Sequence, residues 1–568
     1  MEIPLLTDIV IILGLSIVVL FVCSLLRIPT IVGFFLTGML AGPHGLGLIK
    51  AINEVEILAE IGIVLLLFTI GMEFSLKNLL RIKKSILMGG SLQVWLTFLA
   101  VFVIAMKLGQ SFGESMFLGF LIPLSSTAVV LKVIQERAEV DSPHGSTSLG
   151  ILIYQDVIIV PMMLFTPLLV GATTGLAKSP FALLTEGIGI ILFVVVCAKW
   201  IVPQVLHQIA RTRNRELFLL SVVIICFGFA WLFSSAGLSL ALGAFLAGLI
   251  ISESEYAHQA LGNILPLHDI SMSFFFISIG MLLDVGFLFQ RPGLIVLIAL
   301  GVLALKTIIA GFGTVLLGFP IRTAVLVGLA LSQVGEFSFI LSKTGIEFGL
   351  LAGDIYQMFL AVSVLTMALT PLIIAFAPRT ADFVLRLPMP ERLRRGFSPV
   401  QEVKLAGKKD HLVIIGFGFN GRNLARAAKV RGIPYCIIEM NPETVREEKA
   451  KGEPIYYGDA THEAVLQRAD IEDARVAVVA ISDPTATRRI VELVRKLSPG
   501  VYVIVRTRFL QEVKTLHALG ADEVIPEEFE TSVEIFARVL EKYLVPRDEI
   551  DKYIDEIRSE DYDMLGPR

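Results

Sequence analysis

The sequence predicts a polytopic all-α membrane domain followed by a smaller α/β domain with a doubly wound parallel sheet. The first observation is composition: the 568-residue chain is 55% hydrophobic and 18% charged, whereas soluble proteins carry about 25% charged residues. The second is that residues 1–378 form successive apolar runs of roughly 20 residues, the length that crosses a membrane core. The third is that strand and helix patterns alternate from residue 411 onward, which is typical of a parallel sheet.

About thirteen spanning helices are expected in residues 1–378. Their centres lie near residues 16, 39, 66, 96, 124, 160, 190, 225, 245, 275, 305, 333 and 365. Lys and Arg are concentrated in alternate loops, for example at Lys83, Lys84, Arg211, Arg215 and Arg322, and cytoplasmic loops carry such an excess. With an odd number of spans, this places the N-terminus outside and the C-terminal domain in the cytoplasm.

The membrane part contains an internal duplication. "GFFLTGML" at residue 33 matches "GAFLAGLI" at 243, and "LAEIGIVLLLFTIGM" at 58 matches "LHDISMSFFFISIGM" at 267. The offset, close to 209 residues, also places Gly119 on Gly328. It shifts the chain by seven helices, so the two six-helix repeats (about 1–171 and 214–378) are expected to cross the membrane in opposite senses. Inverted repeats are typical of secondary transporters that work by alternating access; the alternative is chance similarity between apolar segments.

The duplication also predicts two broken helices. "PLSSTAVV" at 123–130 and "SQVGEFSF" at 332–339 occupy corresponding places and interrupt apolar helices with polar residues. Broken helices expose backbone carbonyls and helix ends that coordinate ions near the membrane midplane. Ser125, Ser126 and Thr127 can add hydroxyl oxygens to such a site. Alternatively, each hydroxyl only bonds back to the preceding turn of its own helix.

The central candidate is Asp156, in the apolar run "GILIYQDVIIVP" at 150–161, preceded by Gln155. It lies about 12 Å into its helix at 1.5 Å per residue, where a charged side chain costs about 2.5–3.5 kcal/mol. So costly a group usually faces a cavity or a partner and marks an ion path. A carboxylate there can bind a proton or a monovalent cation, K⁺ or Na⁺, but not both at once, which is the basis of exchange.

Two further charges lie in apolar helices, Lys306 and Glu336. Lys306 is expected near mid-depth, where pairing with Asp156 would lessen the cost of both charges and cation entry would displace the ammonium. The alternative is a static structural salt bridge. Glu336 is expected either to contribute to the ion site or to bind free backbone groups at the helix break.

The C-terminal domain is expected over residues 411–545, after a basic linker at 379–410 and before a charged tail at 546–568. "HLVIIGFGFNGRNLARAAKVRGIPYCIIEM" has a strand, a G-x-G-x-x-G turn, a helix and a second strand that ends near an acidic residue. The turn lets the backbone approach a phosphate, and the acid suits a ribose diol. The predicted nucleotide-binding residues are Gly416, Gly418, Phe419, Asn420, Gly421, Glu439, Met440, Asp459, Ala460 and Thr461.

Five stretches together resemble the bacterial Kef-type monovalent cation:proton antiporters. They are "YQD" at 154, "SSTAVV" at 125, "LGAFLAGLIIS" at 242, "FFFISIGM" at 274 and "SQVGEFSFIL" at 332. The resemblance implies thirteen spans, two crossed broken helices, a homodimer and a place in the bacterial inner membrane. Relatives with an Asp-Asp pair at 155–156 are typically electrogenic and sodium-selective, whereas Gln155 matches the potassium-exporting branch. K⁺/H⁺ exchange is therefore favoured, with Na⁺/H⁺ exchange as the alternative.

"GDAT" at 458 and "HALGADEVIPEE" at 517 resemble the RCK, or TrkA-N, domain. The resemblance implies dimerisation and the binding of AMP or NAD(H) as a regulator rather than a redox cofactor. A cytosolic accessory regulator also occurs in the Kef family. Control by glutathione is less supported, because "GRNLA" before Arg426 departs from the usual glutamine-containing pattern.

Other classes of function are less compatible with the sequence. A nucleotide-gated potassium channel would need a filter of the TVGYG type, which the sequence lacks. A membrane oxidoreductase would need a route for electrons, and neither paired histidines nor paired cysteines mark one. No catalytic constellation accompanies the α/β domain, so the chain is not expected to be an enzyme, and no nucleic-acid partner is expected.

Overall fold

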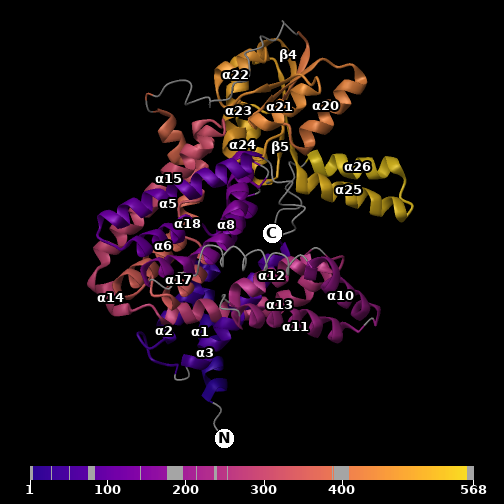
Figure 1. Cartoon of the computed structure of the whole chain (residues 1–568). Helices are drawn as coiled ribbons and strands as arrows, with labels where there is room; N and C mark the ends of the chain where they lie inside the picture. Colours follow the sequence, from indigo (N-terminus) through magenta and orange to yellow (C-terminus); the bar gives the residue numbers. More distant parts are fainter. Residues whose placement is uncertain are drawn as a thin grey trace. The chain divides into compact units, whose positions relative to one another are not determined.

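The computed structural model describes most of the chain (Figure 1). The described residues are 4–26, 28–49, 52–73, 84–137, 139–140, 142–174, 196–212, 214–235, 240–252, 254–386, 388, 409–508 and 510–559. The chain forms two compact units. The first comprises Met1–Leu131, Ser148–Gly313 and Leu326–Ala377, and the second comprises Lys132–Thr147, Thr314–Val325 and Pro378–Arg568. The second unit thus contains two short segments from the apolar part of the sequence, which the expected boundary near residue 378 did not anticipate.

All the regular secondary structure in the described residues of the membrane part is helical. Its helices are α1 (Pro4–Leu25), α2 (Thr30–Ala41), α3 (Ile52–Glu73), α5 (Lys84–Lys107), α6 (Phe112–Leu121), α7 (Thr127–Glu136), α8 (Pro143–Thr174), the π-helix η1 (Cys197–Ile201), α10 (Val202–Arg211), α11 (Arg215–Ser235), α12 (Leu240–Ser252), α13 (Ala257–Met281), α14 (Val285–Gln290), α15 (Pro292–Leu316), α16 (Ile321–Ala330), α17 (Glu336–Glu347) and α18 (Gly353–Arg386). Seven described helices are long and apolar enough to cross a membrane, and five more are shorter apolar helices. The span expected near residue 190 lies outside the described residues, so the total of thirteen stays a prediction.

The apolar residues of these helices are not all buried against protein. In α1, Ile17 is 70% exposed and Phe21 is 66% exposed, and Leu297 in α15 is 66% exposed. A helix that presents large apolar side chains outward along its length is stable where lipid is the solvent. The exposure therefore agrees with the membrane assignment.

The helix bounds confirm the internal duplication. The offset of 209 carries Phe112, Leu121 and Thr127 onto residues 321, 330 and 336, which are the first and last residues of α16 and the first of α17. The pairs α1 and α11, α2 and α12, α3 and α13, α5 and α15, and α8 and α18 correspond in the same way, within a few residues at most of their ends. One offset serving seven helix pairs is incompatible with chance similarity between apolar segments.

The two predicted helix breaks are present and cross each other. The first separates α6 from α7 at residues 122–126, and the second separates α16 from α17 at 331–335. Gly335 N–H donates to Leu124 O at 2.9 Å. A Cβ atom at Gly335 would clash with the backbone of Ser125, so only glycine allows this approach.

The α/β part of the second unit has one six-stranded sheet in the order β3-β2-β1-β4-β5-β6. The strands are β1 (His411–Ile415), β2 (Tyr435–Glu439), β3 (Ile455–Tyr457), β4 (Ala474–Val479), β5 (Tyr502–Thr507) and β6 (Glu523–Pro526), and all adjacent pairs are parallel. In register, Val413 of β1 lies between Cys436 of β2 and Ala477 of β4. This is the doubly wound order, in which the crevice between β1 and β4 receives ligands.

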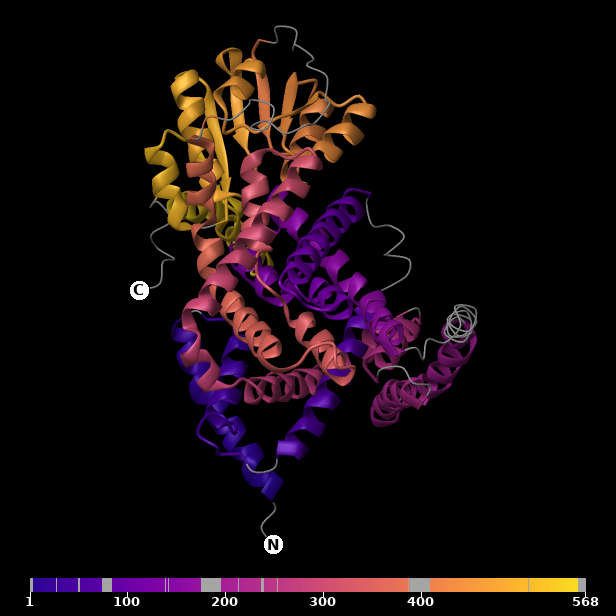
Figure 2. The ribbon, with the colours of Figure 1, turned by 60° about the vertical axis from the view of Figure 1, so that its left-hand side comes forward.

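Helices cover both faces of this sheet (Figure 2). The helices α20 (Phe419–Arg431) and α21 (Pro442–Ala450) share one apolar core with β1–β3, and α22 (Glu463–Arg468), α23 (Pro484–Leu497) and α24 (Val513–Ala518) share a second core on the other face. The 3-10 turns η2 (Ile471–Asp473) and η3 (Leu510–Glu512) and the helices α25 (Glu527–Lys542) and α26 (Arg547–Ser559) complete the described part. The expected charged tail from 546 therefore begins as a helix.

Candidate functional site

The Asp156 carboxylate lies beside the first residue of α7. Thr127 Oγ1 is 3.1 Å from both carboxylate oxygens. Asp156 is partly exposed, whereas its neighbour Gln155 is fully buried. A partly exposed carboxylate next to a hydroxyl, at the end of a broken helix, provides the oxygen ligands that alkali cations prefer and also a group that takes up protons.

Gln155 stabilises the first helix break through a chain of buried amides. Its Oε1 accepts from Ser125 N–H at 2.7 Å, and its Nε2 donates to Gln93 Oε1 at 2.7 Å. Gln93 Nε2 in turn donates to Pro123 O at 3.1 Å and lies 3.4 Å from Thr97 Oγ1. Both functional ends of the Gln155 side chain are thus bonded to the protein. Gln93, in α5, was missed by the sequence analysis, although an amide in an apolar helix is itself a signal.

Lys306 has a different partner from the one expected. Its ammonium donates to Leu124 O at 3.0 Å, Ser125 Oγ at 2.9 Å and Gln333 O at 2.5 Å. An ammonium has three N–H donors, and here all three are directed to uncharged oxygens rather than to the Asp156 carboxylate. Leu124 and Gln333 follow the C-terminal ends of α6 and α16, where the helix dipole is negative. The buried cation therefore stabilises two helix ends.

Glu336 is the counterpart of Lys306. It is the first residue of α17, is 4% exposed, and accepts from Ala128 N–H of α7 at 3.4 Å. A carboxylate is stabilised at the positive N-terminal ends of helices, and Glu336 lies at two of them. This agrees with the expectation that Glu336 binds free backbone groups at a break. Its Oε2 has no hydrogen-bond partner among the described residues.

The hydroxyls of Ser125 and Ser338 join the two repeats. Ser125 Oγ donates to Leu331 O at 2.9 Å, and Ser126 Oγ accepts from Val129 N–H at 3.2 Å. Ser338, in the second repeat, donates to Leu121 O at 2.7 Å. Of the three predicted hydroxyl ligands, Thr127 is thus the one whose hydroxyl lies at the carboxylate.

The glycine turn of the α/β part has the geometry of a phosphate-binding turn. Gly416 has φ +98°, and a Cβ atom at Gly421 would clash with Gly416 O. A Cβ at Gly418 would meet nothing within 4 Å. The first glycine therefore permits the turn, the third permits close packing of helix and strand, and the second leaves open space for a ligand.

A cavity of about 540 Å³ lies at the carboxyl ends of the strands. Glu439 Oε2 accepts from Phe417 N–H and its Oε1 from Asn441 N–H, both at 2.7 Å. Asp459 Oδ1 accepts from the backbone and the hydroxyl of Thr461, whereas its buried Oδ2 has no hydrogen-bond partner among the described residues. A ribose hydroxyl is the type of donor that such an acceptor lacks.

Most of the predicted nucleotide-binding residues line this cavity: Gly416, Gly418, Phe419, Asn420, Glu439, Met440, Asp459 and Ala460. Gly421 and Thr461 support the lining from behind. The cavity is also lined by residues that the sequence patterns do not predict: Ser142, His144, Arg322, Thr323, Arg422, Asp483, Arg506 and Glu527. A signal existed for Arg322, because a cation in the first turn of a helix opposes the helix dipole and needs a partner.

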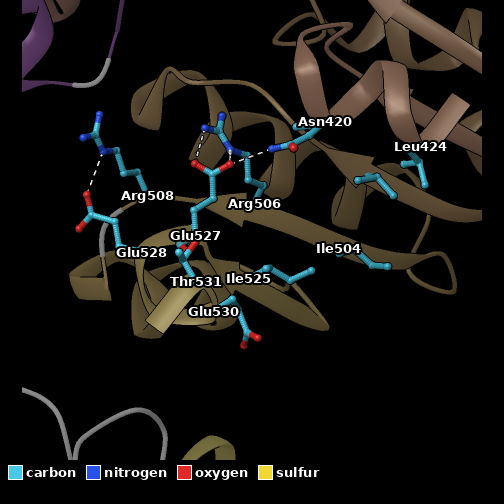
Figure 3. Close-up of a pocket in the computed structure, with 12 residues that line it drawn as sticks. Asn420, Leu424, Ile504, Arg506, Arg508, Ile525, Glu527, Glu528, Glu530 and Thr531 are labelled. Atoms are coloured by element: carbon cyan, nitrogen blue, oxygen red, sulfur yellow. Dashed lines mark hydrogen bonds and ion pairs between the residues drawn. The ribbon is translucent and has the colours of Figure 1, made fainter. Parts of the chain in front are cut away.

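A second hollow, of about 760 Å³, adjoins β5 and β6 (Figure 3). Arg506 forms two 2.6 Å bonds to Glu527, which also accepts from Asn420 Nδ2 at 2.8 Å. The hydrogen bonds from Arg506, and further those from Asn420, hold the pKa of Glu527 below its ordinary value against the effect of burial. These three residues line both hollows.

Two repeats whose broken helices cross beside a partly exposed carboxylate define the class of secondary ion transporters. The family model described as sodium/hydrogen exchanger, transmembrane, matches residues 11–378, and the TrkA-N domain model matches residues 412–527. The chain belongs to the sodium/hydrogen exchanger family and is a cation/proton antiporter with a C-terminal TrkA-N domain.

Known proteins agree with this assignment. A K(+) efflux antiporter named KefB, from Alkalimonas amylolytica, is 30% identical over 97% of this chain and 84% of its own length. A cation/proton antiporter named YbaL, from Escherichia coli (strain K12), is 31% identical over 93% of this chain and 96% of its own. The structure of the sodium proton antiporter MjNhaP1 from Methanocaldococcus jannaschii covers 68% of this chain and all of its own, with a TM-score of 0.51 and 18% identity. It shares the membrane fold, and the names of the relatives agree with a transporter rather than an enzyme.

Proposed function

We propose that this chain exchanges K⁺ for H⁺ by alternating access and exports K⁺ from the cytoplasm. The observation that carries the proposal is the position of Asp156, a partly exposed carboxylate beside Thr127 at the crossing of the broken helices. Gln155 in place of an acid and the K(+) efflux relative support K⁺ as the substrate.

The charges at the crossing support one proton exchanged for one cation. Lys306 and Glu336 are buried and neutralise opposite helix ends, so they remain with the protein in each state. Asp156 then takes up either H⁺ or K⁺, and its own charge is compensated in both cases. Exchange by this route moves no net charge across the membrane.

Transport in proteoliposomes tests this proposal. A pH-sensitive dye inside the vesicles should report proton movement when K⁺ is added, with a smaller response to Na⁺ and no dependence on a clamped membrane potential. Asp156→Asn should reduce the response to that of empty vesicles. Asp354→Asn is the matched control, because that carboxylate is exposed and pairs with Arg291 at 2.9 Å. Exchange retained in Asp156→Asn would refute the carboxylate mechanism.

The TrkA-N part is proposed to bind an adenine nucleotide, AMP or NAD(H), as a regulator of exchange. The glycine turn, Glu439 and the unsatisfied oxygen of Asp459 support a phosphate at the turn and a ribose at the acids. Titration calorimetry on the purified full chain should detect AMP or NADH binding, and Glu439→Gln should weaken it. Unchanged affinity in that variant would reject the ribose site.

We also propose a homodimer in the bacterial inner membrane, with the TrkA-N part in the cytoplasm. The hollow of Figure 3 is lined by apolar residues of three strands, Val478 of β4, Ile504 of β5 and Ile525 of β6. In α25, Ile535 is 58% exposed and Val539 is 47% exposed. A second copy would cover these apolar surfaces. Light scattering of the detergent-solubilised chain should give the mass of two chains, and a monomer would reject this assembly.

A further inference from the structure

The nucleotide cavity is completed by residues far from the TrkA-N part in sequence. Ser142 and His144 come from the segment Lys132–Thr147, and Arg322 and Thr323 come from Thr314–Val325. Both segments belong to the same compact unit as the sheet. Tyr457 of β3 fastens the second segment by donating to Gly318 O at 2.6 Å, and Thr323 Oγ1 lies 3.7 Å from Met440 Sδ. The two segments are therefore part of the cavity wall.

Arg322 is the buried cation of this wall. Its side chain is 5% exposed, and its Nη1 lies 2.7 Å from Asp483 Oδ2 while its Nε lies 3.9 Å from Asp382. Asp483 follows β4 and is also the N-cap of α23, accepting from Thr485 and Ala486 N–H. Burial alone would raise the pKa of Asp483, but the charge of Arg322, with further contributions from His144 and the hydrogen bonds, holds it below its ordinary value. Asp483 is thus the anion that forms an ion pair with the Arg322 guanidinium.

The other charges of the cavity are arranged around this pair. Glu439, Asp459 and Asp483 are acids, so a phosphate entering the cavity needs a cation that can turn toward it. Arg506 is held by two bonds to Glu527. Arg422 lies over the Phe417 ring and donates to Phe417 O. Arg322 has five N–H donors in a planar fork that matches a phosphate, and the anion it now binds is a carboxylate of the same cavity wall.

We propose that the phosphate of the adenine nucleotide binds Arg322 in exchange for Asp483, so that the first turns of α8 and α16 form part of the nucleotide site. The inference rests on the proposed nucleotide regulation and adds how the ligand is sensed. Arg322 is the second residue of α16, which runs to the break at 331–335, and His144 is the second residue of α8, which contains Asp156. A ligand that changes the partner of Arg322 acts directly on a helix that leads to the ion site.

The test compares AMP with adenosine, which lacks the phosphate, by calorimetry on the full-length chain in detergent. Arg322→Gln should lower the affinity for AMP about tenfold, because one strong charge-assisted contact is lost. The affinity of this variant for adenosine should equal that of the wild type within error. Asp483→Asn should raise the affinity for AMP several-fold and leave the affinity for adenosine unchanged. Asparagine keeps the helix cap but, being uncharged, does not compete with the phosphate for the guanidinium. Arg489→Gln is the matched control; its side chain is 45% exposed and lies outside the cavity lining.

The results separate failure of the proposed partner exchange from failure of nucleotide binding itself. If Arg322→Gln fails to fold, Asp483→Asn still decides, because its cap is retained. Parallel changes for AMP and adenosine in the variants, or unchanged AMP affinity in both, would overturn the exchange of partners while nucleotide binding stands. Failure of the wild type to bind AMP, NADH or adenosine would instead refute nucleotide regulation itself, and the inference with it.

Discussion

The ion site and the nucleotide cavity solve the problem of buried charge in different ways. At the ion site, Lys306 and Glu336 are neutralised mainly by backbone groups at helix ends. In the nucleotide cavity, Arg322 is neutralised by the acid Asp483 through one hydrogen bond, whereas Arg506 is held to Glu527 by two. Backbone groups cannot leave their place, whereas a carboxylate partner can be exchanged for another anion. The first arrangement therefore holds a fixed scaffold around Asp156, whereas the second is open to competition by a ligand.

Loss of the Lys306 ammonium should have the greatest effect on stability. Lys306→Met should leave Leu124 O, Gln333 O and Ser125 Oγ without their cation and lower the free energy of unfolding by about 3 kcal/mol. Thermal denaturation followed by fluorescence-detected size exclusion measures this. The control is Lys343→Met, whose pair with Glu60 at 3.0 Å is partly exposed and should contribute less than about 1 kcal/mol. Equal stability of the two variants would show that Lys306 does not support the helix ends.

Two glycines of the same turn, Gly421 and Gly418, should respond differently to replacement by alanine. Gly421→Ala should cost about 2 kcal/mol, because its Cβ would clash with Gly416 O. Gly418→Ala adds a methyl group in open space and should change the free energy of unfolding by less than about 0.5 kcal/mol. It should nevertheless lower the affinity for AMP, because the methyl group occupies the space that the phosphate would enter. Chemical denaturation and calorimetry on both variants give the two quantities. A Gly418→Ala variant that binds AMP normally would place the phosphate elsewhere.

A smaller effect is expected from the amide chain at the first break. Gln93→Leu removes the acceptor for Gln155 Nε2 and the donor to Pro123 O. Buried hydrogen bonds between membrane helices contribute about 0.6 kcal/mol each, up to about 1.7, so the loss should be about 1 kcal/mol. The melting temperature reports it, with Gln93→Glu as a comparison that keeps the acceptor. A melting temperature as high as that of the wild type would make the amide chain incidental.

The smallest effect concerns the Arg506–Glu527 pair. Because the pKa of Glu527 is lowered by Arg506, its stabilising contribution is present above the unfolded value near 4.5 and disappears as the pH falls through the folded value. Arg506→Gln should therefore destabilise by less than about 1 kcal/mol at pH 7, since Glu527 is partly exposed, and by less still near pH 3.5. Circular dichroism melts at both pH values test this. Arg508→Gln, whose pair with Glu528 is more exposed, should give a smaller difference at pH 7, and the reverse order would contradict the assignment.

Four features can be predicted from the sequence: the two-part organisation, the duplication, the places of both helix breaks and the strand–turn–helix of the nucleotide turn. These follow from periodicity, glycine spacing and apolar length, which are local properties of the chain. The partners of the charged and amide side chains, in contrast, depend on the tertiary fold. Lys306 binds helix ends rather than Asp156, Gln155 binds Ser125 and Gln93, and Arg322 reaches the nucleotide cavity. A pattern along the chain shows that a buried charge needs a partner, but the partner depends on which distant backbone and side-chain groups folding brings within hydrogen-bonding distance.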